Sequence, residues 1–219
     1  MTGVDPGILH EWLCARSLSR GLPVPVHDHG GLRVDSGQPA ELRRYVFAAP
    51  TPGLSALAAT ITVPHILIKL CAPLDELLAL LPPGWRGHPQ SCFMTHDGPM
   101  LGGARTVLPQ YTLKIERDGA AWQARVTTVD GSCVASGRAV RHERLLVYDQ
   151  IVTDPGHRRR GLAEHVMRSL ETAGGGSALQ ALTATSDGHE LYAALGWKVI
   201  SLYSTAEFGG PMEKGKAAR

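Results

Sequence analysis

Four consecutive basic residues, at 157–160, run directly into Gly161 and then into a helical pattern. A segment of strand-like composition precedes them, so the stretch predicts a tight loop between a strand and the first turn of a helix. The first amides of a helix have no intrahelical partner, and the helix dipole adds positive charge there. Gly161 and the small Ala163 would let a ligand approach the backbone closely. The arrangement suits a diphosphate lying across the start of a helix, and a solvated basic turn is the alternative interpretation.

Two other phosphate-binding motifs are absent from the sequence. It contains neither G-x-G-x-x-G nor G-x-x-x-x-G-K-[ST]. The segment before the basic loop, RLLVYDQIVTD, follows a run of antiparallel strands rather than opening a strand–helix–strand unit. A dinucleotide fold of the doubly wound type is therefore not expected.

Clear periodicity in the second half of the chain predicts the elements that position the loop. Asp118-Gly119 and Asp130-Gly131 are hairpin signals, and they separate three expected antiparallel strands near 110–117, 121–129 and 132–141. The segment RLLVYDQIVTD is a fourth strand, with an apolar run typical of burial on both faces.

The same periodicity continues after the loop. A helix is expected at 162–173, ended by three glycines. A strand over ALQALTATS, a short helix at 188–195 and a last strand over WKVISLYS complete the pattern.

The first half of the chain is less regular. Residues 1–55 read as mostly loop, with one short helix at 6–20. The segment TITVPHILIKLC, at 60–71, predicts a strand in which Pro64 causes a bulge or a break. A short helix ended by two prolines follows within APLDELLALLPPGW.

Two segments in the second half resemble the GCN5-related N-acetyltransferase (GNAT) superfamily. VTDPGHRRRGLAEHVM is similar to its motif A, with Arg158, Gly161 and Ala163 at the defining positions. About thirty residues later, LTATSDGHELYAALGWKV is similar to the second half of that fold; its matching residues are Leu191, Tyr192, Leu195, Gly196 and Trp197. The resemblance covers roughly residues 110–205. It implies an α/β (α+β) fold, a mixed and mostly antiparallel sheet flanked by helices.

The resemblance also implies acetyl-CoA as cosubstrate, with its pyrophosphate on the backbone amides at 159–163. The pantetheine arm would pair with the edge of the strand that precedes the loop, where that strand separates from its neighbour. An amide of that strand would polarise the acetyl carbonyl while a small-molecule primary amine attacks directly. The implied cofactor-binding residues are Ile151, Val152, Arg158, Arg159, Arg160, Gly161, Leu162 and Ala163.

Two side chains are candidates for proton transfer within this resemblance. Tyr192 is the expected general acid for the departing thiolate, and a packing tyrosine is its alternative interpretation. Asp149 could accept a proton through water or bind a cationic substrate, and a structural role is the alternative. Family members of the histone type carry a glutamate two residues earlier, where this chain has Val147. His142 and Glu143 are the next candidates for the base.

The resemblance leaves the first half of the chain unexplained. Relatives place two helices after their first strand, and the Asp118-Gly119 hairpin leaves no room for them. Either HILIKLCAP is the true first strand, or residues 1–105 form a degenerate second lobe beside a catalytic lobe at 106–219. The two-lobed chain with one cofactor site is favoured, with residues 60–105 building the acceptor wall. A non-catalytic acyl-CoA-binding regulator and a protein or peptide N-acetyltransferase are the alternative functions.

Composition excludes several other classes. The net charge of +2 gives no field that would attract nucleic acid, and no stretch of 18 apolar residues predicts a membrane span. The N-terminus lacks the layout of a signal peptide, so a cytoplasmic protein, monomeric or homodimeric, is expected. The four cysteines have no metal-ligand spacing and are expected as reduced thiols, with no metal bound: Cys14, Cys71, Cys92 and Cys133.

Overall fold

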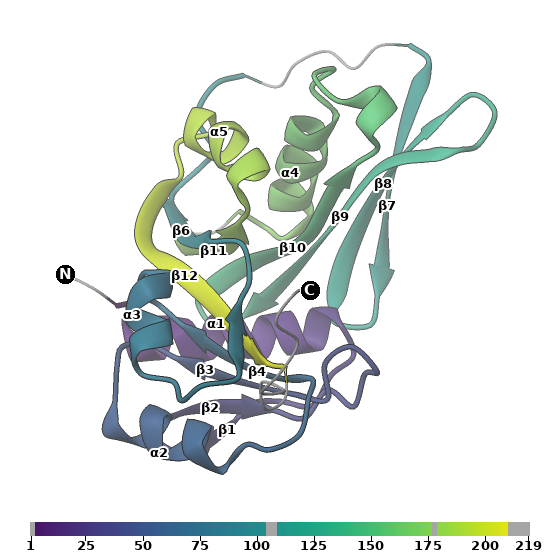
Figure 1. The fold of residues 1–219 in the computed structure, drawn as a ribbon. Coiled ribbons are helices and arrows are strands. Elements are labelled where there is room, and N and C mark those ends of the chain that lie inside the picture. Colours follow the sequence, from purple (N-terminus) through teal and green to yellow (C-terminus); the bar gives the residue numbers. More distant parts are fainter. Residues whose placement is uncertain (1–2, 104–108, 177–178, 210–219) are drawn as a thin grey trace, which may run out of the picture.

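A single mixed sheet organises the chain. The computed structural model describes residues 3–103, 109–176 and 179–209. Within these residues a twelve-stranded sheet has the order β1-β2-β3-β4-β12-β6-β11-β10-β9-β8-β7, and β5 pairs with β12 outside this path (Figure 1). The β3–β4 and β10–β11 pairs are parallel and the other pairs are antiparallel. The predicted mixed, mostly antiparallel sheet flanked by helices is confirmed.

The second half of the chain forms the elements that the sequence predicts. An antiparallel meander comprises β7 (Tyr111–Asp118), β8 (Ala121–Thr128), β9 (Cys133–His142) and β10 (Leu145–Thr153). Its first two turns are made by Gly119 (φ 59°) and Gly131 (φ 86°), so the hairpin signals are confirmed. The elements that follow β10 are η1 (Pro155–His157), α4 (Leu162–Ala173), β11 (Leu179–Ala184), α5 (Ser186–Ala194) and β12 (Lys198–Phe208).

The first half is richer in strands than its sequence suggests. Its elements are α1 (Pro6–Ser19), β1 (Val26–Asp28), β2 (Gly31–Val34), β3 (Arg43–Phe47), α2 (Pro52–Thr60), β4 (Ile66–Leu70), α3 (Leu74–Ala79), β5 (Trp85–Gly87) and β6 (Ser91–Asp97). The expectation that residues 1–55 are mostly loop was wrong, because β1, β2 and β3 are short and turn residues surround them. The strand expected at 60–71 starts only at Ile66, since α2 extends to Thr60 and Pro64 follows it.

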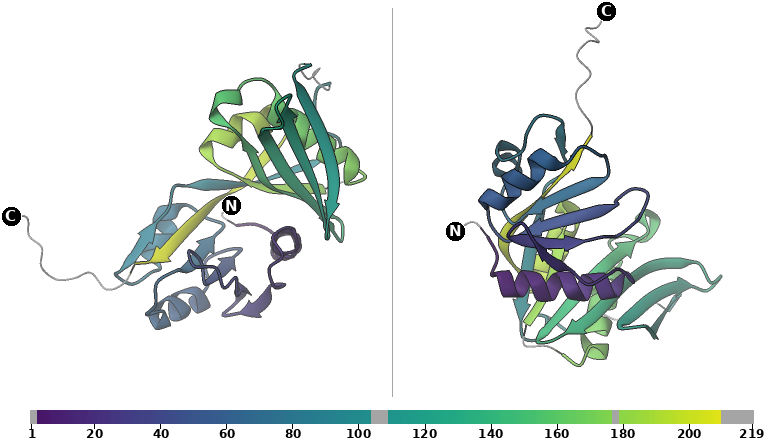
Figure 2. Two further views of the ribbon diagram at one scale, coloured as in Figure 1. Left: turned by 90° about the vertical axis from the view of Figure 1, so that its right-hand side faces the viewer. Right: turned by 90° about the horizontal axis from the view of Figure 1, so that it is seen from below.

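The two halves of the chain exchange strands. β6, from the first half, lies between β11 and β12, while β12 continues past β6 to pair with β4 and β5. Figure 2 shows β12 as the long strand that joins both parts of the molecule. The predicted boundary at residue 105 therefore falls inside one hydrogen-bonded sheet. That residues 1–105 are a degenerate second lobe stays a prediction.

Helices cover both faces of the meander. Leu146 and Tyr148 of β10 pack in one core with Val166 and Leu170 of α4. Val147, between them in the strand, packs on the other face in the core that contains α1 (Figure 2). β10 is therefore covered by α4 on one side and α1 on the other, as its continuous apolar run predicts. Among the described residues, no helix is long and apolar enough to span a membrane.

A glycine on β9 allows α4 to lie close to the sheet. A Cβ atom added at Gly137 would come within 2.4 Å of Ile151 Cδ1 and 2.7 Å of Val166 Cγ1. Val166 is fully buried in the core and cannot move away freely, and Ile151 packs against the same core.

We therefore expect Gly137→Ala to lower the free energy of unfolding by about 1–3 kcal/mol through overpacking. Chemical denaturation measures this change. Gly103→Ala is the control, because nothing lies within 4 Å of the Cβ atom it would introduce. Equal stability of the two variants would contradict the close packing of α4 on β9.

Candidate active site

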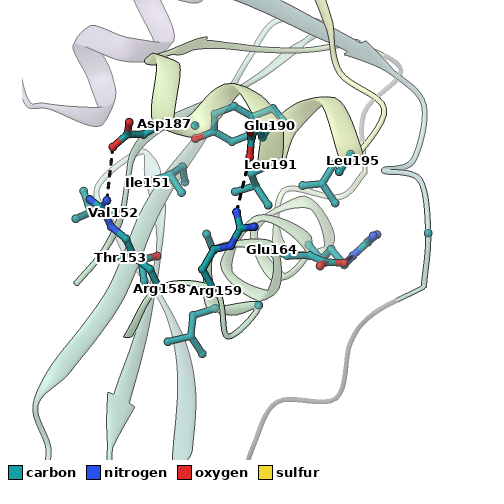
Figure 3. Close-up of a pocket in the computed structure, with 18 of the residues that line it drawn as sticks. Ile151, Val152, Thr153, Arg158, Arg159, Glu164, Asp187, Glu190, Leu191 and Leu195 are labelled. Carbon is teal, nitrogen blue, oxygen red and sulfur yellow. Dashed lines mark hydrogen bonds and ion pairs between the residues drawn. The ribbon is translucent and has the colours of Figure 1, made fainter. Parts of the chain in front are cut away.

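A large cavity lies where β10 separates from β11. These strands pair in parallel at Leu145–Val147 and Leu179–Ala181, so the end of β10 has no strand partner on that side among the described residues. The space between β10, α4 and α5 forms a cavity of about 1070 Å³, called here the main cavity (Figure 3). Its walls include Ile151, Val152, Gly161, Ala163 and Tyr192. The structure therefore brings most of the residues predicted for the site together.

A bulge in β10 determines which residues face the main cavity. The pairing of β10 with β9 shifts register between Asp149 and Val152, and Gln150 has a positive φ of 56°. Tyr148 packs against α4, so strict alternation would direct Ile151 to the opposite face. The inserted residue reverses this phase, and Ile151 packs on the α4 side and lines the cavity.

The basic loop is held in a left-handed turn at the start of α4. Arg159 (φ 63°) and Gly161 (φ 77°) adopt this conformation, which explains the glycine at 161. Gly161 is the N-cap residue, and no side chain caps the helix. Asp154 stabilises the loop from the other end, because its Oδ1 accepts a 2.9 Å hydrogen bond from the Gly156 amide. The first amides of α4 are thus available to an anion in the cavity.

Two of the three loop arginines face the cavity. Arg158 Nη1 lies 3.5 Å from Asp187 Oδ2, and Arg159 Nη1 lies 3.7 Å from Glu190 Oε2 (Figure 3). Both acids belong to α5, across the opening of the main cavity. All four side chains are more than half exposed, so these ion pairs contribute little to stability and can exchange for a ligand.

Arg160 takes a different position from the one the sequence suggests. Its Nη1 donates a 2.7 Å hydrogen bond to the Tyr111 hydroxyl, which lies 2.9 Å from His157 Nδ1. Arg160 does not line the main cavity. Its guanidinium instead ties the loop to β7, and only its backbone remains a candidate for contact with a ligand.

Tyr192 lies at the wall of the main cavity. Its side chain is largely buried beside Gly188 and the Trp197 ring, whose centroid is 6.2 Å away. Burial raises the pKa of its hydroxyl to about 12, so the phenol stays protonated at neutral pH. The position fits the predicted role, and the role itself stays a prediction.

Asp149 lies on the other face of the sheet. It is 8% exposed and binds two arginines of α1: Arg20 Nη2 donates to Oδ1 at 2.8 Å, and Arg16 Nε lies 3.4 Å from the same oxygen. Burial raises the pKa of this carboxyl, but the hydrogen bond from Arg20 and the two positive charges outweigh it and hold the pKa below its ordinary value. Asp149 is thus placed as the anchor of α1, because a weakly basic carboxylate outside the main cavity is a poor proton acceptor there.

The other candidates for a base also lie outside the main cavity. His142 and Glu143 are at the turn where β10 begins, whereas the basic loop follows its last residue. The sequence reasoning missed Asp187 and Glu190, which are three residues apart on one face of α5. The sequence did contain a signal for them: two acidic residues at helical spacing in a segment expected to lie near the basic loop. Among the described residues no cluster of metal-ligating side chains is present.

Comparison with known proteins identifies the fold. No protein-family model and no curated protein matches the sequence. A GCN5-related N-acetyltransferase from Kribbella flavida has a similar structure, with a TM-score of 0.65 and 15% identity over 97% of this chain and 98% of that one. A GNAT-family acetyltransferase from Novosphingobium aromaticivorans gives a TM-score of 0.56 and 20% identity over 93% of this chain and 100% of that one.

A tandem GNAT protein from the clavulanic acid biosynthesis pathway is also similar, with a TM-score of 0.55 and 13% identity. The similarity covers 84% of this chain and 80% of that protein. All three neighbours are GNAT proteins and the likeness extends over most of this chain. The chain therefore has the GNAT fold, as its two motifs predicted.

We expect Asp149→Asn to lower the free energy of unfolding by about 3 kcal/mol, because it leaves the buried guanidinium of Arg16 and that of Arg20 without a negative partner. The carboxylate's contribution should be present at pH values above about 4, its unfolded pKa, and be lost as the pH falls through its lower folded pKa. Denaturation at several pH values measures both effects.

Asp118→Asn is the matched control for Asp149→Asn. Asp118 also pairs with an arginine, Arg138, but it is 59% exposed, so its loss should cost less than about 1 kcal/mol. An Asp149→Asn protein of unchanged stability and abolished activity would contradict the anchoring role and restore the catalytic one.

Proposed function

We propose that the chain is an acetyl-CoA-dependent N-acetyltransferase that acetylates the primary amine of a small molecule. The observation that carries this proposal is the meeting of three features at one cavity. These are the uncapped start of α4 after Gly161, the edge of β10 that is free on its β11 side, and the protonated hydroxyl of Tyr192. The GNAT fold is consistent with this activity.

The main cavity fits the parts of acetyl-CoA. The left-handed turn at Gly161 exposes the first amides of α4 for a pyrophosphate, and Arg158 and Arg159 add positive charge beside it. Asp187 and Glu190 would have to release these arginines as the phosphates enter. The backbone of Ile151 and Val152, free on the β11 side, can pair with the amide groups of the pantetheine arm. Acetyl-CoA would supply the activated acetyl thioester.

Two groups of the chain would stabilise the charges that develop during acetyl transfer. A backbone amide at Ile151 or Val152 would polarise the thioester carbonyl and stabilise the negative charge that develops when the amine attacks. Tyr192 would donate a hydrogen bond to the departing sulfur. Its pKa of about 12 lies well above the value of about 8.5 typical of a thiol, so stabilisation of the thiolate by this hydrogen bond is favoured over complete proton transfer.

Titration with CoA and detection of free thiol in the presence of acetyl-CoA and a panel of amines test the proposal. Thiol release with one or more small amines is the expected result. Tight CoA binding without thiol release from any amine, peptide or protein would instead support a non-catalytic acyl-CoA-binding regulator. Acetylation of peptides alone would support the protein-directed alternative, and absence of CoA binding would overturn the whole proposal.

Gly161→Glu should weaken CoA binding by about 100-fold, because it places bulk and negative charge at the pyrophosphate position. Loss of two charge-assisted hydrogen bonds of about 1.5 kcal/mol each corresponds to this factor. Arg158→Ala should cost less than about fivefold, since exposed ion pairs contribute at most about 1 kcal/mol. Calorimetric titration ranks the three proteins.

Gly131→Glu provides the control for Gly161→Glu. Gly131 also has a positive φ, of 86°, and nothing lies within 4 Å of its added Cβ atom, so backbone strain and added charge are matched. It lies at the β8–β9 turn, outside the main cavity. Equal CoA affinity of the Gly161→Glu and Gly131→Glu proteins would refute the placement of the pyrophosphate.

Tyr192→Phe should lower kcat by about 10²–10³-fold, the usual cost of removing one preorganised hydrogen-bond donor. CoA affinity should barely change, because the aromatic ring and its packing on Trp197 are retained. Steady-state kinetics with an identified acceptor, combined with CoA titration, separates the two effects. A loss of kcat of about threefold or less in the Tyr192→Phe enzyme would exclude this role, because such a loss is far smaller than the expected one.

A further inference from the structure

A second cavity lies on the other side of β10. It is an open pocket with a volume of about 570 Å³, lined by the end of α1, the β2–β3 segment, Arg44 of β3 and the β7–β8 turn. Gln150 lines this second cavity, and the next residue, Ile151, lines the main cavity. Neighbouring residues of the β10 bulge thus line the two cavities. A molecule in the second cavity would approach the strand from the face opposite to a thioester in the main cavity.

The walls of the second cavity are positively charged. Arg20, Arg44 and Arg138 line it. In this part of the described chain four guanidinium groups pair with only three carboxylates: Arg16 and Arg20 with Asp149, Arg44 with Glu41, and Arg138 with Asp118. One positive charge is therefore in excess, in a partly buried site where screening by solvent is weak.

The pKa of the neighbouring Lys69 is affected by the same positive charges. Lys69 donates a 3.2 Å hydrogen bond to Thr205 Oγ1 behind the cavity wall. Burial is the main cause that lowers the pKa of its ammonium group to about 7; the positive charges of Arg16 and Arg44 contribute to this lowering, and Glu41 opposes it. The cost of adding another cation here is high, and an anion would be stabilised.

Arg138 has spare hydrogen-bonding capacity. Its Nη2 lies 2.8 Å from Asp118 Oδ2, while its Nε is buried and has no hydrogen-bond partner among the described residues. Ser19 Oγ, also in the wall, is another buried polar atom without a partner there. Both atoms are shielded from solvent, so an anion in the cavity would have to pair with the Nη atoms of Arg138. Asp118 is mostly exposed, so a ligand anion can replace it at Arg138.

We propose that the second cavity binds the acceptor, and that the acceptor carries a carboxylate or phosphate group in addition to its amine. This inference rests on the N-acetyltransferase function proposed above. A guanidinium presents a planar fork of donors that matches either anion. The volume lies within the range of small-molecule sites, and the positive wall disfavours polyamines and lysine-rich peptides. The amine of the acceptor would face the bulge at Gln150, beyond which the thioester would lie.

A matched acceptor panel tests the inference with the thiol-release reaction. It contains an α-amino acid, the methyl ester of that amino acid, an aminoalkyl phosphate and a diamine. We expect turnover of the amino acid or the aminoalkyl phosphate, and at least tenfold lower kcat/KM for the ester and the diamine. The anionic compound with the higher kcat/KM shows whether the anionic group of the acceptor is a carboxylate or a phosphate. Preferred turnover of the diamine would overturn the inference while leaving the N-acetyltransferase function intact.

Three variants locate the anion. Arg138→Gln should raise KM for the anionic acceptor about tenfold or more, with kcat and CoA affinity nearly unchanged. Asp118→Asn should lower KM, because it removes the competing carboxylate. Arg86→Gln, on β5 and outside both cavities, is the control. Unchanged KM in both the Arg138 and Asp118 variants would exclude the second cavity.

A binding measurement separates this inference from the proposed function. Inorganic phosphate is titrated at saturating CoA, which blocks the main cavity, into wild type and Arg138→Gln. Binding that is lost in the variant supports the anion site even if no acceptor is acetylated, in which case only the transferase function fails. Binding that is absent in wild type or unaffected by Arg138→Gln overturns the site.

Discussion

The short parallel pairing of β10 with β11, followed by the bulge at Gln150, is the constraint on which the whole site depends. Because the two strands stay paired over only three residues each, the end of β10 keeps a free backbone edge and a cavity opens beside it. The bulge adds one residue and so reverses the alternation of side chains. Ile151 consequently belongs to the α4 face, although Asp149, two residues earlier, belongs to the α1 face. Without the extra residue, the two cavities would not meet at neighbouring positions of one strand.

The buried ion pair of Asp149 with Arg16 and Arg20 holds the first half of the chain against this strand. Each partner would be costly to bury alone, so the three groups fix α1 in one position on β10. Strand exchange adds a second constraint, since β6 of the first half pairs with β11 and β12 of the second half, and β12 also pairs with β4 and β5 of the first half. The residues that close the second cavity, at 18–22, 38 and 44, are thereby placed beside the meander. The sequence suggested 60–105 as the acceptor wall; from that range the main cavity takes only Leu101, Gly102 and Gly103.

The parts of the site that could be predicted were those encoded locally. The basic loop, Gly161 and the apolar stripe of α4 are visible in one continuous stretch, and the Asp-Gly pairs locate the hairpins. Gln150 gave no such signal, because nothing about a glutamine indicates a bulge. The sequence left the role of Asp149 open for a related reason: its partners are 129 and 133 residues away in the sequence. β6 also escaped prediction, since it gains its place only by pairing with β11 and β12, which come much later in the chain.

The two cavities differ in how their positive charges are balanced, and this difference supports the two roles proposed for them. At the main cavity, Arg158 and Arg159 pair with acids that are exposed to solvent, so a ligand can take over these arginines at little cost. At the second cavity, Arg20 and Arg44 are bound to Asp149 and Glu41, which are mostly buried. Releasing either arginine would leave a buried carboxylate uncompensated, so both stay in place as a fixed positive wall. Among the arginines that line this cavity in the described part of the chain, Arg138 alone has an exposed partner, Asp118, and can change partner. The main cavity thus has two exchangeable cations, which suits an extended polyanion, and the second cavity has one, which suits a ligand with a single anionic group.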